Sequence, residues 1–217
     1  MIKKFATVCA AVVILPAIAV AQKPMAATYI TDEEVKAVNA TPGVDRQIVN
    51  LDIGKSNFAV GIIHRGKTGA PPAAAAAGAA GRGGAAPAAA AAPQPCGETG
   101  TPPAGGVPGG ISHDGQTEGY LIVSGGGTLV TGGKIYNGRK SGPESEVTTT
   151  LNGPSCSGAI AGADVVKKVV KTGDIIIIPA GVPHGWTEIG DHVDYLSFRP
   201  DPDRVLKAGY VHPAIKK

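Results

Sequence analysis

The feature that most constrains the fold of this chain is its succession of short apolar runs, each bounded by glycine, proline or aspartate. Runs of this kind, rich in β-branched and aromatic residues, are typical of β-strands. We expect strands at residues 49–53, 58–64, 120–123, 128–130, 165–170, 175–178 and 193–198. With only one clear helix signal beside them, these strands favour an all-β sandwich or barrel.

The segments between the strands predict turns, one long loop and one helix. Residues 125–127, three consecutive glycines, predict a turn between a strand and its return strand. Residues 140–162 are rich in Gly, Ser, Pro and Thr, which predicts a long loop or a hairpin insertion. Near the N-terminus, Thr31 followed by Glu34 forms a capping box and predicts a short helix that ends near residues 40–43.

The N-terminal segment has the pattern of an export signal. Two lysines precede the apolar residues 5–20, and Ala19 and Ala21 are the small residues that a signal peptidase requires. A membrane anchor is the alternative, but Pro16 interrupts the apolar run, which is also short for a bilayer. We therefore expect residues 1–21 to be a signal peptide that is removed, and the mature chain to be periplasmic or secreted.

The mature chain, residues 22–217, has the length of one domain with a sizeable core. The formal net charge is only +3, and the lysines and arginines form no stripe interleaved with aromatic residues. We therefore expect no nucleic-acid partner. No second apolar run approaches membrane-spanning length, so we expect no membrane association after the signal is removed.

Residues 69–110 differ in composition from the rest of the chain. They are mostly Ala, Gly and Pro, with Arg82 and Glu98 as the only charged side chains. Repeated Gly and Pro interrupt any helix, and few large apolar side chains are present to offset the entropy of ordering. We expect a flexible surface insertion between two strands of the domain. A domain linker is the alternative, but the segment before it is too short to fold alone.

Removal of the signal peptide would leave two cysteines, Cys96 and Cys156, in a compartment where disulfides persist. Their pairing would close a loop of about 60 residues and contribute about 4 kcal/mol in the chain-entropy model. Two free thiols are the alternative. A metal role is disfavoured because neither cysteine has a Cys or His at ligand spacing. We predict a structural disulfide.

Two segments carry the residues that suggest chemistry. They read Gly105-x5-Ile111-x-His113-x4-Glu118-x6-Gly125 and Gly173-x5-Pro179-x-Gly181-x2-His184. His113 ends one strand, Glu118 follows a four-residue bend, and His184 follows a bend made by proline and glycine, so the three can converge. Two imidazoles and one carboxylate inside a barrel suit divalent iron, manganese or zinc and leave positions for water, oxygen or substrate. Hydrogen-bonded core histidines are the alternative.

These segments resemble the paired signature motifs of the cupin superfamily, and the resemblance covers residues 105–188. In register are the glycines, the second histidine and the glutamate of the first motif, and the histidine of the second. The resemblance implies a double-stranded β-helix, which is a jelly-roll barrel, with a metal ion held by His113, Glu118 and His184. It also makes a homodimer a reasonable expectation, because cupins commonly associate through outer strands.

The chain departs from the cupin pattern at two positions. Ile111 stands where the family usually has its first histidine, so the usual four-ligand site loses one ligand. Three protein ligands plus water still form a workable site. Glu188 stands where an asparagine is common. His64 is a candidate for the missing ligand, but a strand-end histidine beside Arg65 is usually solvated.

Two functions remain open at this point. The first is a metal-dependent enzyme of dioxygenase, isomerase or decarboxylase type that acts on a small organic molecule. Period two places Tyr120 on the face of Glu118 and Trp186 on the face of His184, so both could shape a substrate pocket or simply fill the barrel. The second is a non-catalytic module that binds a sugar or another small ligand. The reaction and the catalytic residues are not determined by the sequence.

Overall fold

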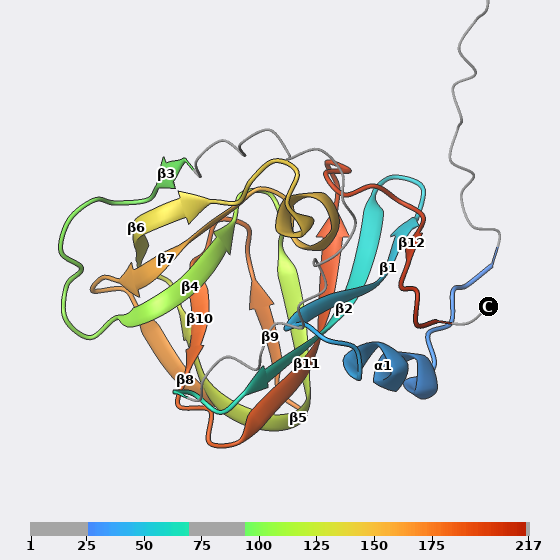
Figure 1. The fold of residues 1–217 in the computed structure, drawn as a ribbon, viewed down its shortest axis with the longest axis horizontal. Coiled ribbons are helices and arrows are strands. Elements are labelled where there is room, and N and C mark those ends of the chain that lie inside the picture. The colour runs from blue at the N-terminus through green and yellow to red at the C-terminus, as the bar shows by residue number, and fades with distance from the viewer. Residues whose placement is uncertain (1–25, 70–93, 216–217) are drawn as a thin grey trace, which may run out of the picture.

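The computed structural model describes residues 26–69 and 94–215, which form two antiparallel sheets that face each other (Figure 1). The strands are β1 (Asp45–Asp52), β2 (Asn57–Gly66), β3 (Pro95–Cys96), β4 (Val107–His113), β5 (Glu118–Thr131), β6 (Lys134–Lys140), β7 (Ser155–Ala161), β8 (Val166–Lys171), β9 (Ile175–Ile178), β10 (His184–Thr187), β11 (His192–Asp201) and β12 (Tyr210–Val211). One sheet contains β12, β1, β2, β11, β9 and the first half of β5. The second half of β5 joins β8, β10, β4, β7, β6 and β3 in the other. This is an all-β jelly-roll architecture, as the sequence predicted.

The longest strand, β5, connects the two sheets. Its first half pairs with β11 and β9, and its second half pairs with β8 and β10. The prediction of a turn at residues 125–127 was therefore wrong, because these glycines lie inside one continuous strand. Gly125 has φ +66°, and a Cβ there would lie 2.0 Å from the carbonyl oxygen of His192. The glycines let the strand bend between sheets while another backbone passes close to it.

The predicted N-terminal helix is present as α1 (Asp32–Asn39), and both hydrogen bonds of its capping box are formed. It packs on the outer face of β1 and β2, where Val38, Ile48 and Ile62 form a buried cluster. The next residue along β2, Ile63, belongs instead to the cluster between the two sheets. Strand β2 is thus buried on both faces, and the interior of the barrel is separate from the core under the helix.

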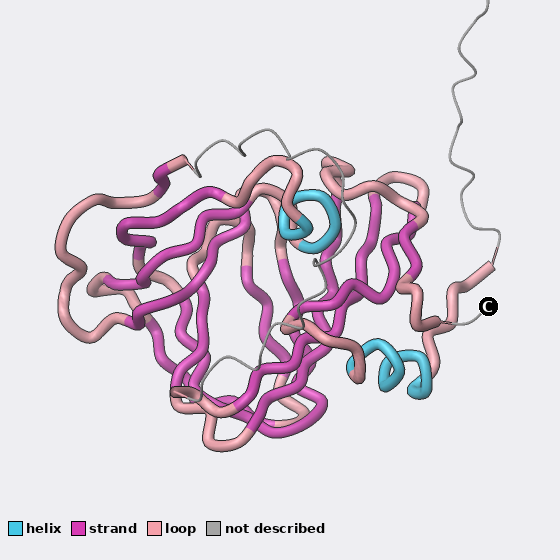
Figure 2. Tube along the Cα trace, in the orientation of Figure 1, coloured by secondary structure: helices cyan, strands magenta, loops and turns pink. Residues whose placement is uncertain are grey.

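Residues 141–154, named here the capping segment, lie between β6 and β7 and contain a π-helical turn, η1 (Val147–Leu151). Figure 2 shows this turn between the two sheets at one end of the barrel. The carbonyl oxygen of Leu151 accepts a hydrogen bond from Arg199 of β11 at 3.2 Å. The predicted insertion at 140–162 was too long, because its last part is β7, a strand paired on both sides by β4 and β6.

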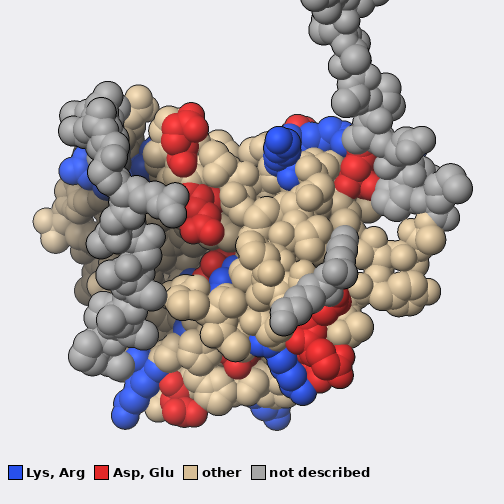
Figure 3. Space-filling view, turned by 45° about the vertical axis from the view of Figure 1, so that its right-hand side comes forward, with Lys and Arg blue, Asp and Glu red and all other residues tan. Residues whose placement is uncertain are grey.

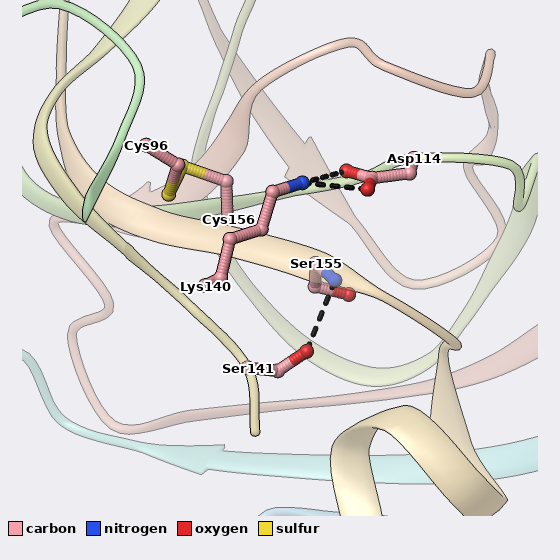
Figure 4. Close-up of a disulfide and its surroundings, with 6 residues drawn as sticks. All are labelled: Cys96, Asp114, Lys140, Ser141, Ser155 and Cys156. Atoms are coloured by element: carbon pink, nitrogen blue, oxygen red, sulfur yellow. Dashed lines mark hydrogen bonds and ion pairs between the residues drawn. A yellow bond between two sulfur atoms is a disulfide. The ribbon is translucent and has the colours of Figure 1, made fainter. Parts of the chain in front are cut away.

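The predicted insertion at 69–110 contains two strands in its C-terminal part. These are β3 and the beginning of β4, which starts at Val107. Cys96 of β3 and Cys156 of β7 form a disulfide, with 2.03 Å between the sulfur atoms (Figure 4). Beside it Lys140 binds both carboxylate oxygens of Asp114. The disulfide and the ion pair hold the outer strands of this sheet to the end of β4.

The predicted signal peptide, residues 1–21, and residues 70–93 of the predicted insertion lie outside the described residues. Within the described ranges, no helix is long and apolar enough to cross a membrane. Acidic and basic side chains are interspersed over the face drawn in Figure 3.

Candidate metal centre

Three strand ends place the predicted ligands together at one end of the barrel. His113 is the last residue of β4, Glu118 is the first of β5, and His184 is the first of β10. Strand β10 pairs with β4 through His184 and Ile111, and β9 pairs with β5 through Ile178 and Glu118. The three side chains are buried, with exposed fractions between 1 and 4 %.

The ligand atoms converge on a single carboxylate oxygen. Oε2 of Glu118 lies 3.2 Å from Nε2 of His113 and 3.3 Å from Nε2 of His184. The nitrogen and oxygen atoms that these residues can offer to an ion all lie within 4.8 Å of one another. The imidazole rings meet edge to face, with 5.0 Å between their centroids.

The hydrogen bonds behind the imidazoles fix which ring nitrogens carry protons. Nδ1 of His184 lies 3.0 Å from the carbonyl oxygen of Val182, which can only accept, so this nitrogen is protonated. Nδ1 of His113 lies 2.8 Å from Oγ of Ser155, whose own hydroxyl donates to the carbonyl of Gly153. That nitrogen is therefore protonated too. In neutral imidazoles both Nε2 atoms then direct lone pairs toward Glu118.

The Glu118 carboxylate is oriented by donors on its other side. Oε1 accepts from Nε of Arg199 at 2.8 Å and from Oγ of Ser197 at 2.9 Å. Tyr120 donates its hydroxyl to Oε2 at 2.7 Å. Burial raises the pKa of Glu118, but the charge of Arg199 leads the opposing effects, and the pKa is held well below its usual range. The carboxylate is therefore ionised and offers Oε2 to a cation through one oxygen.

The arginine that holds Glu118 was not predicted from the sequence. Arg199 is 1 % exposed, and its guanidinium also binds Oδ2 of Asp45 at 2.6 Å and Oε1 of Gln47 at 3.0 Å. The signal was present in the alternation of β11, whose buried face reads Val193, Tyr195, Ser197, Arg199, Asp201. Its inner residues change from apolar to polar toward the end of the barrel that holds the three ligands.

This donor set fits a divalent metal ion. Two imidazole nitrogens and one carboxylate oxygen face one another, an arrangement in which a cation can bind all three atoms. Two histidines and one carboxylate suit iron, manganese or zinc, and burial limits competing water. The His113, Glu118 and His184 group can therefore hold a metal ion.

The other predicted residues differ in their relation to this centre. Tyr120 is linked to the metal centre by its hydrogen bond to Glu118. The indole N–H of Trp186 instead donates to the hydroxyl of Tyr195 at 3.3 Å, within the hydrophobic cluster between the two sheets. His64 is an exposed residue that binds Asp194 at 2.6 Å, which agrees with the expectation of a solvated histidine. Glu188 accepts a hydrogen bond from Thr128.

The fold and the site together define an all-β jelly-roll protein with a buried two-histidine, one-carboxylate group. No protein-family model and no curated protein matches the chain. Among solved structures, it is similar to an oxalate oxidase in complex with glycolate, with 14 % identity, 75 % of this chain covered and a TM-score of 0.30. This chain spans about half (54 %) of that oxidase chain.

A second similar structure is Peruvianin-I, a cysteine peptidase from Thevetia peruviana latex. Its identity is 10 %, 80 % of this chain and 76 % of that chain are covered, and the TM-score is 0.34. Both TM-scores are below 0.5, so neither similarity assigns a function to this chain.

Proposed function

We propose that this chain is a metal-binding protein of cupin type that takes a divalent ion on His113, Glu118 and His184. The observation that carries the proposal is the convergence of both Nε2 atoms on one carboxylate oxygen, at 3.2 and 3.3 Å, while both Nδ1 atoms bind the protein behind them. A histidine that only filled the core would need no such convergence.

The bound ion would supply a Lewis acid or an oxygen-activating centre for a small organic molecule. The protein's own contribution is positional. Arg199 and Ser197 hold Oε1 of Glu118, so that Oε2 is the oxygen turned toward the histidines and the ion. Tyr120 places a hydroxyl donor beside the same oxygen, where it can bind a ligand of the ion. The capping segment lies at this end of the barrel, where the carbonyl of its Leu151 accepts from Arg199.

A non-catalytic role in binding a small ligand is the second candidate. Ile111 favours it, because this residue lies opposite His184 where a fourth ligand would complete the usual cupin site. Turnover of a small organic substrate by the metal-loaded protein would exclude this role. Ligand-induced shifts of the melting temperature without product would support it.

Export to the periplasm or beyond is part of the same proposal. The disulfide between Cys96 and Cys156 supports it, since disulfides persist in oxidising compartments. The mass of the mature protein, isolated from the host, tests this directly. A chain that begins at Gln22 is expected, and a chain that retains residues 1–21 would contradict it.

Elemental analysis of the purified protein tests the metal proposal. We expect about one divalent ion per chain in the wild type and less than about a tenth of that in His113→Ala and His184→Ala. His64→Ala is the matched control, because this histidine also binds a carboxylate but lies on the surface. No metal in the wild type after reconstitution, or equal metal in all variants, would refute the proposed site.

A further inference from the structure

Gln116 lies in the bend that joins two of the proposed metal ligands, His113 and Glu118, and is used by none of the interactions described so far. Burial alternates along this part of the chain, with Gln116, Glu118 and Tyr120 buried and the residues between them less so. Gln116 precedes β5, which begins at Glu118, and its side chain is nevertheless buried like that of Glu118. Its exposed fraction is 2 %.

The amide of Gln116 makes no hydrogen bond to the part of the chain that the structure describes. Within the described residues, neither its Nε2 nor its Oε1 makes a hydrogen bond, and the same is true of Oδ1 of Asn152 and Oδ1 of Asp45. Buried amides are nearly always paired, because an unpaired one has lost its bonds to water and gained nothing. An amide with both atoms unpaired at this depth points to a ligand that supplies the missing bonds.

Two series of hydrogen bonds lead from Asn152 and its neighbour Gly153 to the metal centre. Asn152 donates to Oδ2 of Asp45 at 3.3 Å, and the same oxygen binds Arg199, which binds Glu118. The neighbouring Gly153 accepts from Ser155, which binds His113. Gln116 packs toward this glycine, since a Cβ added to Gly153 would lie 3.9 Å from its Cγ. The capping segment thus lies near Gln116 and is linked by hydrogen bonds to the residues that hold His113 and Glu118.

We propose that Gln116 and Asn152 form a subsite that recognises the hydroxyl groups of a small hydroxy acid whose carboxylate binds the metal. This inference rests on the proposed function. The unpaired atoms of these two residues comprise one N–H donor group and two acceptor oxygens. A hydroxyl both donates and accepts, so it can satisfy both kinds, whereas a carboxylate alone would leave both oxygens unpaired.

The charges of the centre favour an acid over a neutral polyol. Both histidines are neutral ligands, and the Glu118 carboxylate is already matched by the Arg199 guanidinium. Within the described ranges the other charged partner of that arginine is Asp45, so a divalent ion leaves this cluster with a net positive charge. A carboxylate on the ion offsets this charge in a site that water barely reaches.

Succinate, malate and tartrate provide a graded test, because they share two carboxylates and carry no, one and two hydroxyl groups. Calorimetric titration into the metal-loaded wild type is expected to show a dissociation constant that falls about fivefold or more with each hydroxyl. In Gln116→Met, a replacement of similar size without the amide, the three acids are expected to bind within about twofold of one another. Equal affinities in the wild type, the same gradient in Gln116→Met, or no binding of any acid would overturn the inference.

The melting temperature of the ligand-free protein gives an independent readout. Gln116→Met is expected to raise it by a few degrees, because an apolar side chain removes two unpaired polar atoms from the interior. Gln47→Met is the matched control: Gln47 is equally buried, but its amide is paired with Val49 and Arg199, so its loss should lower the melting temperature. A lower melting temperature in Gln116→Met would show that the amide is satisfied internally and would overturn the inference.

Metal content separates the two levels of the proposal. Wild type that holds its ion but shows no hydroxyl gradient refutes the hydroxy-acid subsite and leaves the proposed metal function intact. Wild type without an ion refutes the proposed function, and the subsite with it.

Discussion

Arg199 and Glu118 form a fully buried ion pair across neighbouring strands, with Nε of the arginine 2.8 Å from Oε1 of the glutamate. The two oxygens of the Glu118 carboxylate have different partners. One oxygen is bound by Arg199 and Ser197, and the other faces the two histidines. A second carboxylate, Asp45, binds the far side of the guanidinium at 2.6 Å. The geometry of the candidate metal centre therefore depends on β1 and β11 as much as on the strands that carry its ligands.

Replacement of Arg199 by methionine is expected to destabilise the protein by about 3–5 kcal/mol, because Glu118 would be left as a buried carboxylate without its arginine. Urea unfolding measures this change. Arg204→Met is the matched control: Arg204 binds Asp52 at 3.0 Å, but 40 % of its side chain is exposed, and pairs of that kind contribute about 1 kcal/mol or less. Similar losses in the two variants would contradict the structural role assigned to Arg199.

The metal-free protein is expected to lose stability as the pH falls below about 6.5. Burial lowers the pKa of His113 from its ordinary value of 6.5, so the unfolded chain takes up this proton before the folded one. The contribution of His113 to the free energy of unfolding is therefore fully present above pH 6.5. It is lost as the pH falls through the pKa of His113 in the folded state. The lowered pKa of Glu118 adds a second loss that starts below about 4.5.

Urea unfolding in the presence of a chelator, from pH 8 to pH 4, measures these losses. His113→Gln should lack the first loss, because glutamine does not titrate. His64→Ala should keep it, since His64 lies outside the barrel interior. A free energy of unfolding that stays constant in the wild type between pH 7 and pH 5 would contradict the prediction.

The three ligands could be predicted from the sequence because their spacing is set by local chain geometry. His113 and Glu118 are separated by one bend, and His184 follows a proline and glycine turn. Arg199 and Gln116 could not be found in the same way. Arg199 reaches Glu118 through a sequence separation of 81 residues, and an unpaired amide becomes visible only when every neighbour is placed. Pairing between distant strands, rather than local pattern, decides both contacts.

The errors in the predicted fold have a similar cause. Three glycines in a row are a sound turn signal, but here they permit a bend within β5 because the backbone at His192 passes close to Gly125. Strand β7 was predicted to lie within a long loop or a hairpin insertion because residues 140–162 are rich in Gly, Ser, Pro and Thr. Its place between β4 and β6 allows close packing, since a Cβ on Gly158 would lie 2.6 Å from the carbonyl oxygen of Tyr136. Small residues fit in β7 because the backbones of the neighbouring strands lie close to it and leave little room for larger side chains.

Loss of the disulfide is expected to lower stability without removing the metal site. The bridge joins residues 60 positions apart, and the chain-entropy model assigns about 4 kcal/mol to a loop of that length. Urea unfolding of Cys96→Ser/Cys156→Ser, compared with the wild type, measures the change. Metal content should be the same in both, because the two cysteines pack in a core cluster that contains none of the three ligands. A variant that unfolds at the same urea concentration as the wild type would refute the structural role of the disulfide.

Gly125→Ala is expected to disrupt the passage of β5 between the sheets. The new Cβ would meet backbone, the His192 carbonyl oxygen at 2.0 Å, and the residue would have to adopt a φ of +66° that alanine rarely adopts. Backbone cannot move aside as a flexible side chain can, so we expect a loss of about 3 kcal/mol or more. Gly115→Ala is the matched control, because a Cβ there would meet nothing within 4 Å, and its stability should stay within about 0.5 kcal/mol of the wild type. Urea unfolding of both variants decides the matter. If Gly125→Ala were as stable as Gly115→Ala, β5 would not cross the barrel at that residue, and the first half of β5, which begins with Glu118, would lose the constraint that places it opposite the histidines.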